Sequence, residues 1–301
     1  MIRCDRATVA RAGVVVVEGL SLAIEPGQAL AVVGRTGAGK SSLLLAAATA
    51  LPLHAGDIAV EGFSVRREPR QVRQRIGYVP DRPPDWPGVR AGEFLELFAA
   101  TAGLAGPRLR AAVERGLDLA GLALRGRTPL DALPAGEAKR LLLARALIHD
   151  PPVLLLDDPF TGLDPAEADG VARLIADAQL VGRTVVAAID SAAGPACVTH
   201  LAVLREGRLV ATGPAEPASF AAGRRWRHRI ECPGAAPAAA RALAARGIEA
   251  TASDPSALIV VHDPARGPFA DLLASLVADG IPVESATFDP PWPAQLLAEP
   301  G

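Results

Sequence analysis

The stretch Gly34-Arg35-Thr36-Gly37-Ala38-Gly39-Lys40-Ser41 decides the fold of this chain of 301 residues. It follows an apolar run, residues 29–33, and precedes a helix-like run, residues 42–50. A strand, a loop of the pattern GxxxxGK[ST] and a helix in this order form a P-loop. A glycine-rich turn can match the pattern by chance, but the flanking strand and helix make that the weaker interpretation.

The P-loop predicts that the chain binds a nucleoside triphosphate with Mg²⁺. Glycines let successive backbone N–H groups curl around a phosphate at a helix N-terminus, where the helix dipole favours an anion. Lys40 is placed to reach the β- and γ-phosphates, and the hydroxyl of Ser41 is placed to bind Mg²⁺. The predicted phosphate-binding residues are Gly34, Arg35, Thr36, Gly37, Ala38, Gly39, Lys40, Ser41 and Ser42.

Composition favours a globular protein of two domains, or one large domain with an appendage. Half of the residues are apolar and the formal net charge is −2, so charge gives no general reason to bind nucleic acid or anionic lipid. The three cysteines lie far apart, which fits a reducing cytosol. Because no stretch approaches the roughly 20 apolar residues that span a bilayer, we expect no direct membrane insertion.

The hydrophobic patterns predict an α/β domain over residues 1–215. Residues 2–24 and 56–79 read as short strands of a β-rich lobe, and residues 82–150 as a helical insert with apolar residues at helical spacing. Two short apolar runs, 153–156 and 185–189, with a helix between them, are typical of a βαβ unit in a parallel sheet.

A second domain is predicted over residues 224–301. Arg225, Arg227 and Arg229 alternate with Trp226, His228 and Ile230, which indicates a strand with one charged face. The following patterns complete the order βαββαβ, which suggests a small α+β domain of the ferredoxin-like type. The basic run also admits a nucleic-acid or lipid interpretation, but its period of two favours a solvated strand face.

Further motifs follow the P-loop in a fixed order. Residues 154–157 form an apolar strand that ends in Asp157, a Walker B aspartate for Mg²⁺, and residues 161–164 resemble a D-loop. Residues 76–81 resemble a Q-loop, and residues 133–137 occupy the place of a signature motif. In this order the chain resembles the nucleotide-binding subunits of ABC transporters. The resemblance implies a P-loop core with an antiparallel β subdomain, and an ATP held between two cassettes.

Several motif positions depart from the family pattern. Asp81 replaces the usual Gln, and an ionised carboxylate can still coordinate Mg²⁺ but cannot donate a hydrogen bond. In the signature, Pro134 removes the serine hydroxyl and a backbone N–H, Ala135 replaces a glycine and Glu137 replaces a glutamine. Of the signature residues that contact phosphate in the family, only Gly136 is kept in this chain.

The catalytic positions also differ. Asp158 stands where the family has the glutamate that polarises water, and is shorter by one methylene, roughly 1.5 Å, whereas a general base must approach its proton within about 3 Å. Asp190 stands at the switch-histidine position and, when ionised, would face the γ-phosphate as an acceptor only. His200 is the weaker candidate for that role. Arg11 takes the place of the adenine-stacking aromatic residue and could stack by its guanidinium plane.

The first hypothesis is therefore the cytosolic ATP-binding subunit of a bacterial exporter, peripheral on the inner face of the cell membrane through a permease. It would pair with a second cassette as a homodimer or heterodimer, with impaired hydrolysis. The alternative is a regulatory or scaffolding pseudo-ATPase beside a competent ATPase. Soluble ABC proteins of translation or DNA repair are disfavoured, because such chains usually carry paired cassettes or zinc-binding cysteines. Trp86 could be an exposed contact for the permease or a locally packed residue.

Overall fold

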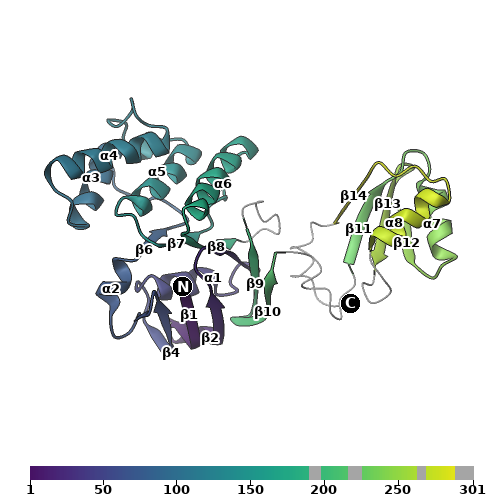
Figure 1. Ribbon diagram of the computed structural model, residues 1–301, viewed down its shortest axis with the longest axis horizontal. Helices are drawn as coiled ribbons and strands as arrows, with labels where there is room; N and C mark the ends of the chain where they lie inside the picture. The colour runs from purple at the N-terminus through teal and green to yellow at the C-terminus, as the bar shows by residue number, and fades with distance from the viewer. Residues whose placement is uncertain (190–197, 216–225, 263–268, 289–301) are drawn as a thin grey trace. The chain divides into compact units, whose positions relative to one another are not determined.

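The chain folds into two compact units (Figure 1). The computed structural model describes residues 1–189, 198–215, 226–262 and 269–288. The first unit comprises the described residues up to 210, and the second comprises those from 211 onward. Each unit has its own hydrophobic core. The first unit contains the P-loop, so it carries the predicted site.

A six-stranded sheet with the order β10-β9-β3-β8-β7-β6 forms the centre of the first unit. The pairings of β3 with β8 and β9, and of β7 with β6 and β8, are parallel. Every residue of β3, β7 and β8 is buried, as expected for parallel strands with both faces covered. This confirms the apolar runs as central strands. The strands are β3 (Ala29–Val33), β6 (Ile76–Val79), β7 (Val153–Asp157), β8 (Thr184–Ile189), β9 (His200–Arg205) and β10 (Arg208–Pro214).

A second, antiparallel sheet with the order β2-β1-β4-β5 forms the predicted β subdomain. β1 and β2 are joined at Ala12 and Gly13, whose φ angles of 48° and 81° close the tight turn. The prediction of two strands around this turn is confirmed. The strands are β1 (Ile2–Arg11), β2 (Val14–Ile24), β4 (Leu53–Val60) and β5 (Phe63–Ser64).

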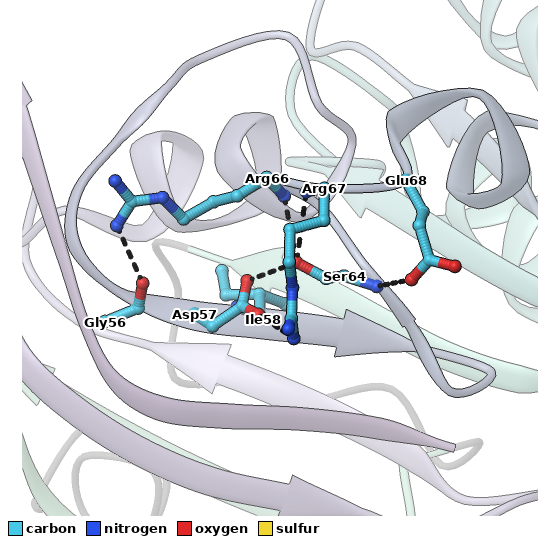
Figure 2. A network of polar contacts seen from close by, with 7 residues as sticks. All are labelled: Gly56, Asp57, Ile58, Ser64, Arg66, Arg67 and Glu68. Atoms are coloured by element: carbon cyan, nitrogen blue, oxygen red, sulfur yellow. Dashed lines mark hydrogen bonds and ion pairs between the residues drawn. The ribbon is translucent and has the colours of Figure 1, made fainter.

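A polar network links β4 and β5 to the segment that leads from this subdomain into the next helix (Figure 2). Asp57 Oδ1 accepts hydrogen bonds from Ile58 N at 2.9 Å and from Ser64 Oγ at 3.0 Å. Ser64 Oγ in turn accepts hydrogen bonds from Arg66 N at 3.3 Å and from Arg67 N at 3.2 Å. Ser64 N donates to Glu68 Oε2 at 3.2 Å. Glu68 directly precedes the short helix α2 (Pro69–Arg73), so the network sets where that helix begins.

The stretch expected to be a helical insert, residues 82–150, contains helices in the structure. Its helices α3, α4 and α5 pack against one another, and a single 3₁₀ turn, Leu130–Ala132, precedes α5. Helix α6 connects β7 to β8, as a parallel crossover requires. The helices of the first unit, besides α2, are α1 (Lys40–Ala47), α3 (Ala91–Thr101), α4 (Gly106–Ala120), α5 (Ala135–Leu147) and α6 (Pro165–Leu180).

The second unit has the element order βαββαβ that the sequence predicted. Its sheet has the order β12-β13-β11-β14, and the pairings are antiparallel. His228 and Ile230 are buried while Arg227 is exposed, which confirms the period of two in this strand; Arg225 lies outside the described residues. The elements are β11 (Trp226–Glu231), α7 (Ala236–Ala244), β12 (Glu249–Ala252), β13 (Ala257–His262), α8 (Phe269–Ala278) and β14 (Ser285–Phe288).

Candidate nucleotide site

The P-loop connects the end of β3 to the start of α1, and its glycines are required by close backbone contacts. A Cβ atom at Gly34 would lie 2.6 Å from the carbonyl oxygen of Leu204, and one at Gly39 would lie 2.3 Å from that of Val16. Gly39 also has a φ of 99°, which glycine adopts without strain. The N–H groups in the first turn of α1 have no carbonyl partner within the helix, so they can receive an anion.

Lys40 lies across this loop. Its side chain is 7% exposed, and Nζ donates to the carbonyl oxygens of Gly34 at 2.9 Å and Arg35 at 3.2 Å. The ammonium is therefore held at the mouth of the loop, where a phosphate oxygen is a stronger acceptor than a carbonyl. Contact of Lys40 with phosphate stays a prediction that this position allows.

Ser41 and Asp157 meet although 116 positions separate them. Ser41 Oγ donates to Asp157 Oδ1 at 2.8 Å, and Tyr78 Oη donates to Asp157 Oδ2 at 3.4 Å. Burial raises the pKa of Asp157 above its ordinary value, and the two hydrogen bonds oppose this shift. Burial and then the Asp157 carboxylate raise the pKa of Tyr78, so its phenol stays protonated as a donor.

Asp158 has an unusual backbone conformation. Its φ is 47°, in the left-handed region that non-glycine residues rarely adopt. Its N–H donates to the carbonyl oxygen of Ala188 at 2.9 Å, and its carbonyl oxygen accepts from Lys139 Nζ at 2.8 Å. Lys139 also donates to the backbone carbonyl of Asp81. Sequence reasoning assigned no site role to Lys139 or to Tyr78, although Tyr78 lies in the stretch that resembles a Q-loop.

One cavity of about 350 Å³ brings most of the predicted residues together. The apolar residues Val16 and Ala188, which sequence reasoning missed, also line it. Gly34, Arg35 and Ala38 do not line the cavity, but they belong to the loop that forms its wall. The predicted residues that line the cavity are Arg11, Thr36, Gly37, Gly39, Lys40, Ser41, Ser42, Asp81, Asp157 and Asp158.

The other predicted positions lie elsewhere. Gly136 is buried in the first turn of α5, where its N–H donates to Glu167 Oε1 at 3.2 Å. His200 begins β9, and its Nε2 is 3.2 Å from Gln28 Nε2. It does not line the cavity described above. Asp190, the predicted switch position, lies outside the described residues.

The cavity fits a nucleoside triphosphate with Mg²⁺. The glycine-lined wall and Lys40 suit phosphate oxygens, and the hydroxyl of Ser41 beside the carboxylate of Asp157 is a pair of hard oxygen ligands. Among the described residues no three His, Cys, Asp or Glu side chains gather to hold a metal ion. Mg²⁺ commonly takes only one or two protein ligands and completes its shell with water and phosphate, so the pair is sufficient.

A second cavity of about 660 Å³ has a basic lining. Arg70, Arg73, Arg145 and His149 line it together with Phe98, and no carboxylate belongs to its described lining. The Nε atom of Arg145 is buried without a hydrogen-bond acceptor among the described residues, and the guanidinium lies 4.8 Å from the centroid of the Phe98 ring. Burial lowers the pKa of Arg145 to about 10, so the group stays charged at neutral pH.

Trp86 lies beside this basic cavity and is 37% exposed. Its ring stacks on Phe98 with the centroids 6.2 Å apart, and meets Phe94 edge to face at 5.7 Å. Trp86 is thus locally packed and partly exposed at once, and its contact with a permease stays a prediction.

The chain is similar to known proteins in sequence and in fold. The family profile described as ABC transporter matches residues 17–161. The Nod factor export ATP-binding protein I of Burkholderia pseudomallei (strain K96243) is 35% identical over 199 residues, 66% of each chain. The linearmycin resistance ATP-binding protein LnrL of Bacillus subtilis (strain 168) is 27% identical over 171 residues, 57% of this chain and 55% of that one. The matches span 66% and 55% of the lengths of these two relatives.

Solved structures give the same fold. The dimeric ATP-binding cassette MJ0796, in a post-hydrolysis state bound to ADP and Pi, superposes with a TM-score of 0.66 at 21% identity, over 72% of this chain and 99% of that one. Within the described residues, no helix has the length and apolar character needed to cross a bilayer. The motif order, the P-loop geometry and these matches together show that the chain carries an ATP-binding cassette of the ABC transporter type.

Proposed function

We propose that this chain is the ATP-binding subunit of a bacterial exporter. It binds Mg·ATP at residues 34–42 and couples the closure of a cassette dimer to a separate membrane permease. The observation that carries this proposal is the contact of Ser41 with Asp157 beside Lys40, in one cavity of about 350 Å³. ABC cassettes dimerise and pair with permeases, and the similar proteins named above are described as export and resistance proteins.

Each residue of the cavity has a role in this proposal. The N–H groups of the loop and the ammonium of Lys40 bind the phosphates, while Ser41 and Asp157 hold Mg²⁺, with Asp81 as a further carboxylate. When bound, Mg²⁺ offsets part of the phosphate charge. Arg11 lies at the end of β1 and lines the cavity, so its guanidinium plane is available to stack on the adenine.

Hydrolysis is proposed to be slow. Asp158 carries a carboxylate one methylene shorter than glutamate, about 1.5 Å, and a general base must come within about 3 Å of its proton. Asp190 would replace a histidine with a group that repels the γ-phosphate when ionised. At the signature, Pro134 is the N-cap of α5 and offers no hydroxyl, and the N–H of Gly136 already donates to Glu167.

The alternative function is a pseudo-ATPase that stabilises an assembly and leaves turnover to a competent partner cassette. The bond between Gly136 and Glu167 favours it, because this N–H is one that a partner's nucleotide would need. In a homodimer both composite sites would combine the same altered residues. In a heterodimer the partner would supply its own catalytic residues, but would still close against Pro134 and Ala135.

The permease is proposed to dock at the basic cavity beside Trp86. Arg145 has a buried Nε that lacks an acceptor within the described structure, and Arg70 and Arg73 add positive charge. A cytoplasmic segment with an acidic side chain would supply the acceptor. In this proposal the subunit lies on the inner face of the cell membrane through its permease, and its cassette spans residues 1–215. Residues 224–301 would form a ferredoxin-like accessory domain of the same subunit.

Nucleotide binding and turnover are tested separately. A fluorescent ATP analogue with Mg²⁺ should bind the wild-type chain, and Lys40→Ala should weaken binding by at least about tenfold, because a charged hydrogen bond to phosphate is lost. Equal binding by both proteins would contradict the assignment of the loop. Turnover of the wild type should rise on combining Asp158→Glu with Asp190→His. Wild-type turnover at rates usual for transporter subunits would refute impaired hydrolysis and leave ATP binding intact.

A further inference from the structure

Lys139 is a buried cation that none of the sequence motifs explains. It lies in the second turn of α5 and is 6% exposed. Its ammonium contacts two residues that line the nucleotide cavity, Asp81 and Asp158, although it does not line the cavity itself. Burying a lysine is costly unless its charge and its three donors are satisfied, so this placement requires a reason.

The contacts of Lys139 tie three segments together. Nζ donates to the backbone carbonyl of Asp81 and, at 2.8 Å, to that of Asp158, and lies 3.5 Å from Asp81 Oδ1. Asp81 follows β6, Asp158 follows β7, and Lys139 comes from the helical insert. The ammonium of Lys139 therefore connects Asp81 of the Q-loop and Asp158 at the general-base position to α5, the helix that begins in the signature motif and is called the signature helix below.

The bond to Asp158 bears on the direction of its carboxylate. A non-glycine residue in the left-handed region carries about 1–3 kcal/mol of strain and keeps that conformation only when its surroundings fix it. The N–H of Asp158 is held by Ala188, and its carbonyl is held by Lys139. With both backbone groups held, the side chain leaves the backbone toward the cavity that it lines.

The positive charge of Lys139 offsets part of the negative charge of the aspartates that line the cavity. Asp81, Asp157 and Asp158 line it, against the cations Lys40 and Arg11, and the expected ligand is a polyanion. Arg82 Nε also lies 3.5 Å from Asp81 Oδ2, but its side chain is 89% exposed, so water screens that pair. The side chain of Lys139 is 7% exposed, so water screens its charge much less.

We propose that Lys139 is a positioning residue of the nucleotide site, which holds the backbone at Asp81 and Asp158 and neutralises the Asp81 carboxylate so that the cavity accepts a triphosphate. The inference rests on the proposed nucleotide binding. Asp81 stands where the family usually has a neutral glutamine. In this inference its added negative charge is compensated by Lys139, which lies 58 positions away in the sequence.

The test is a double-mutant cycle on binding of a fluorescent ATP analogue with Mg²⁺. Lys139→Met should weaken binding by about tenfold in the wild-type background, because an uncompensated carboxylate then faces the phosphates. In the Asp81→Asn background the same substitution should cost about threefold or less, since that charge is gone. Arg140→Gln, one position along α5 and bonded to Ala120 O at 3.1 Å, is the matched control and should bind as the wild type does.

The outcomes separate this inference from the function on which it rests. Unchanged affinity in Lys139→Met overturns the positioning role, and an equal loss in both backgrounds overturns the neutralisation of Asp81; wild-type binding still stands in either case. Absence of binding by the wild type overturns both. Thermal unfolding followed by circular dichroism checks that each variant is folded. Should Lys139→Met be unfolded, Lys139→Gln, which keeps a donor without the charge, takes its place and should show the same coupling to Asp81.

Discussion

At the residue scale, Gly39 shows how closely the phosphate loop is packed. It has a φ of 99°, and a Cβ atom would meet the carbonyl oxygen of Val16 at 2.3 Å and Cγ2 of Val17 at 2.9 Å. Gly37, two positions earlier, has a similar φ of 85° but nothing within 4 Å of its Cβ position. A side chain at Gly37 would cause backbone strain alone, whereas one at Gly39 would cause backbone strain and a steric clash.

This pair gives a prediction for stability. Gly37→Ala should lower the free energy of unfolding by about 1–2 kcal/mol, the cost of a left-handed conformation for an L-residue. Gly39→Ala adds a collision with backbone that cannot move aside, so it should cost more than about 3 kcal/mol. Urea unfolding of the two variants measures the difference. Equal destabilisation would contradict the close contact with β2.

At the element scale, Glu167 joins the beginnings of two helices. It is the third residue of α6, where Oε2 accepts from Asp164 N at 3.2 Å and the Asp164 side chain accepts from Glu167 N at 2.8 Å. Its other carboxylate oxygen accepts from Gly136 N in the first turn of α5. One side chain thus caps α6 and also satisfies a donor of the signature helix.

Glu167→Ala is expected to lower the free energy of unfolding by about 1–2 kcal/mol, because two backbone N–H groups lose their acceptor. Glu167→Gln keeps only one of the two acceptor oxygens that the carboxylate uses, so its stability should lie between those of the wild type and the alanine variant, about 0.5–1 kcal/mol below the wild type. Thermal or urea unfolding of the two variants measures both values. A glutamine variant as unstable as the alanine variant would show that the remaining acceptor oxygen does not stabilise this junction.

The same elements show how far sequence reasoning reaches. The P-loop was predictable because its strand, glycines, lysine and helix are contiguous, and the helical insert because its apolar spacing is local. The bonds Tyr78 to Asp157, Lys139 to Asp81 and Gly136 to Glu167 span 79, 58 and 31 positions. Such pairs depend on how the strands and helices pack, so single-residue patterns could not identify Tyr78, Lys139 or Glu167.

At the scale of the whole molecule, the second unit carries a buried titratable cluster of its own. His228 is 4% exposed, its ring stacks on Phe269 with centroids 3.6 Å apart, and the ring of His262 lies 5.7 Å away. Burial, and next the nearby His262, lower the pKa of His228 from 6.5 to about 4. The folded unit therefore holds this imidazole neutral where an unfolded chain would protonate it.

The stability of the second unit should fall as the pH falls below neutral. His228 contributes no penalty above its unfolded pKa of 6.5, and stability falls as the pH drops from there toward about 4. Between pH 7 and pH 5 the loss should be about 2 kcal/mol. Hydrogen exchange of peptides from residues 226–262 should accelerate over this range, and His228→Phe should reduce the acceleration. Exchange that is independent of pH after correction for intrinsic rates would contradict the shifted pKa.

Val16 has a consequence for the amino-terminal strands. Its carbonyl oxygen faces Gly39 in the phosphate loop, and a Cβ at Gly207, before β10, would approach the same atom to 2.7 Å. Glu18 N donates to Gly207 O at 2.9 Å, and β2 is an edge strand of its sheet. The phosphate loop cannot move away from β2 without leaving a gap, so the mobility of the loop and the mobility of β2 are coupled. A ligand that orders the phosphate loop would therefore also order β2, which it does not contact. Fraying of β2 would in turn weaken binding of that ligand.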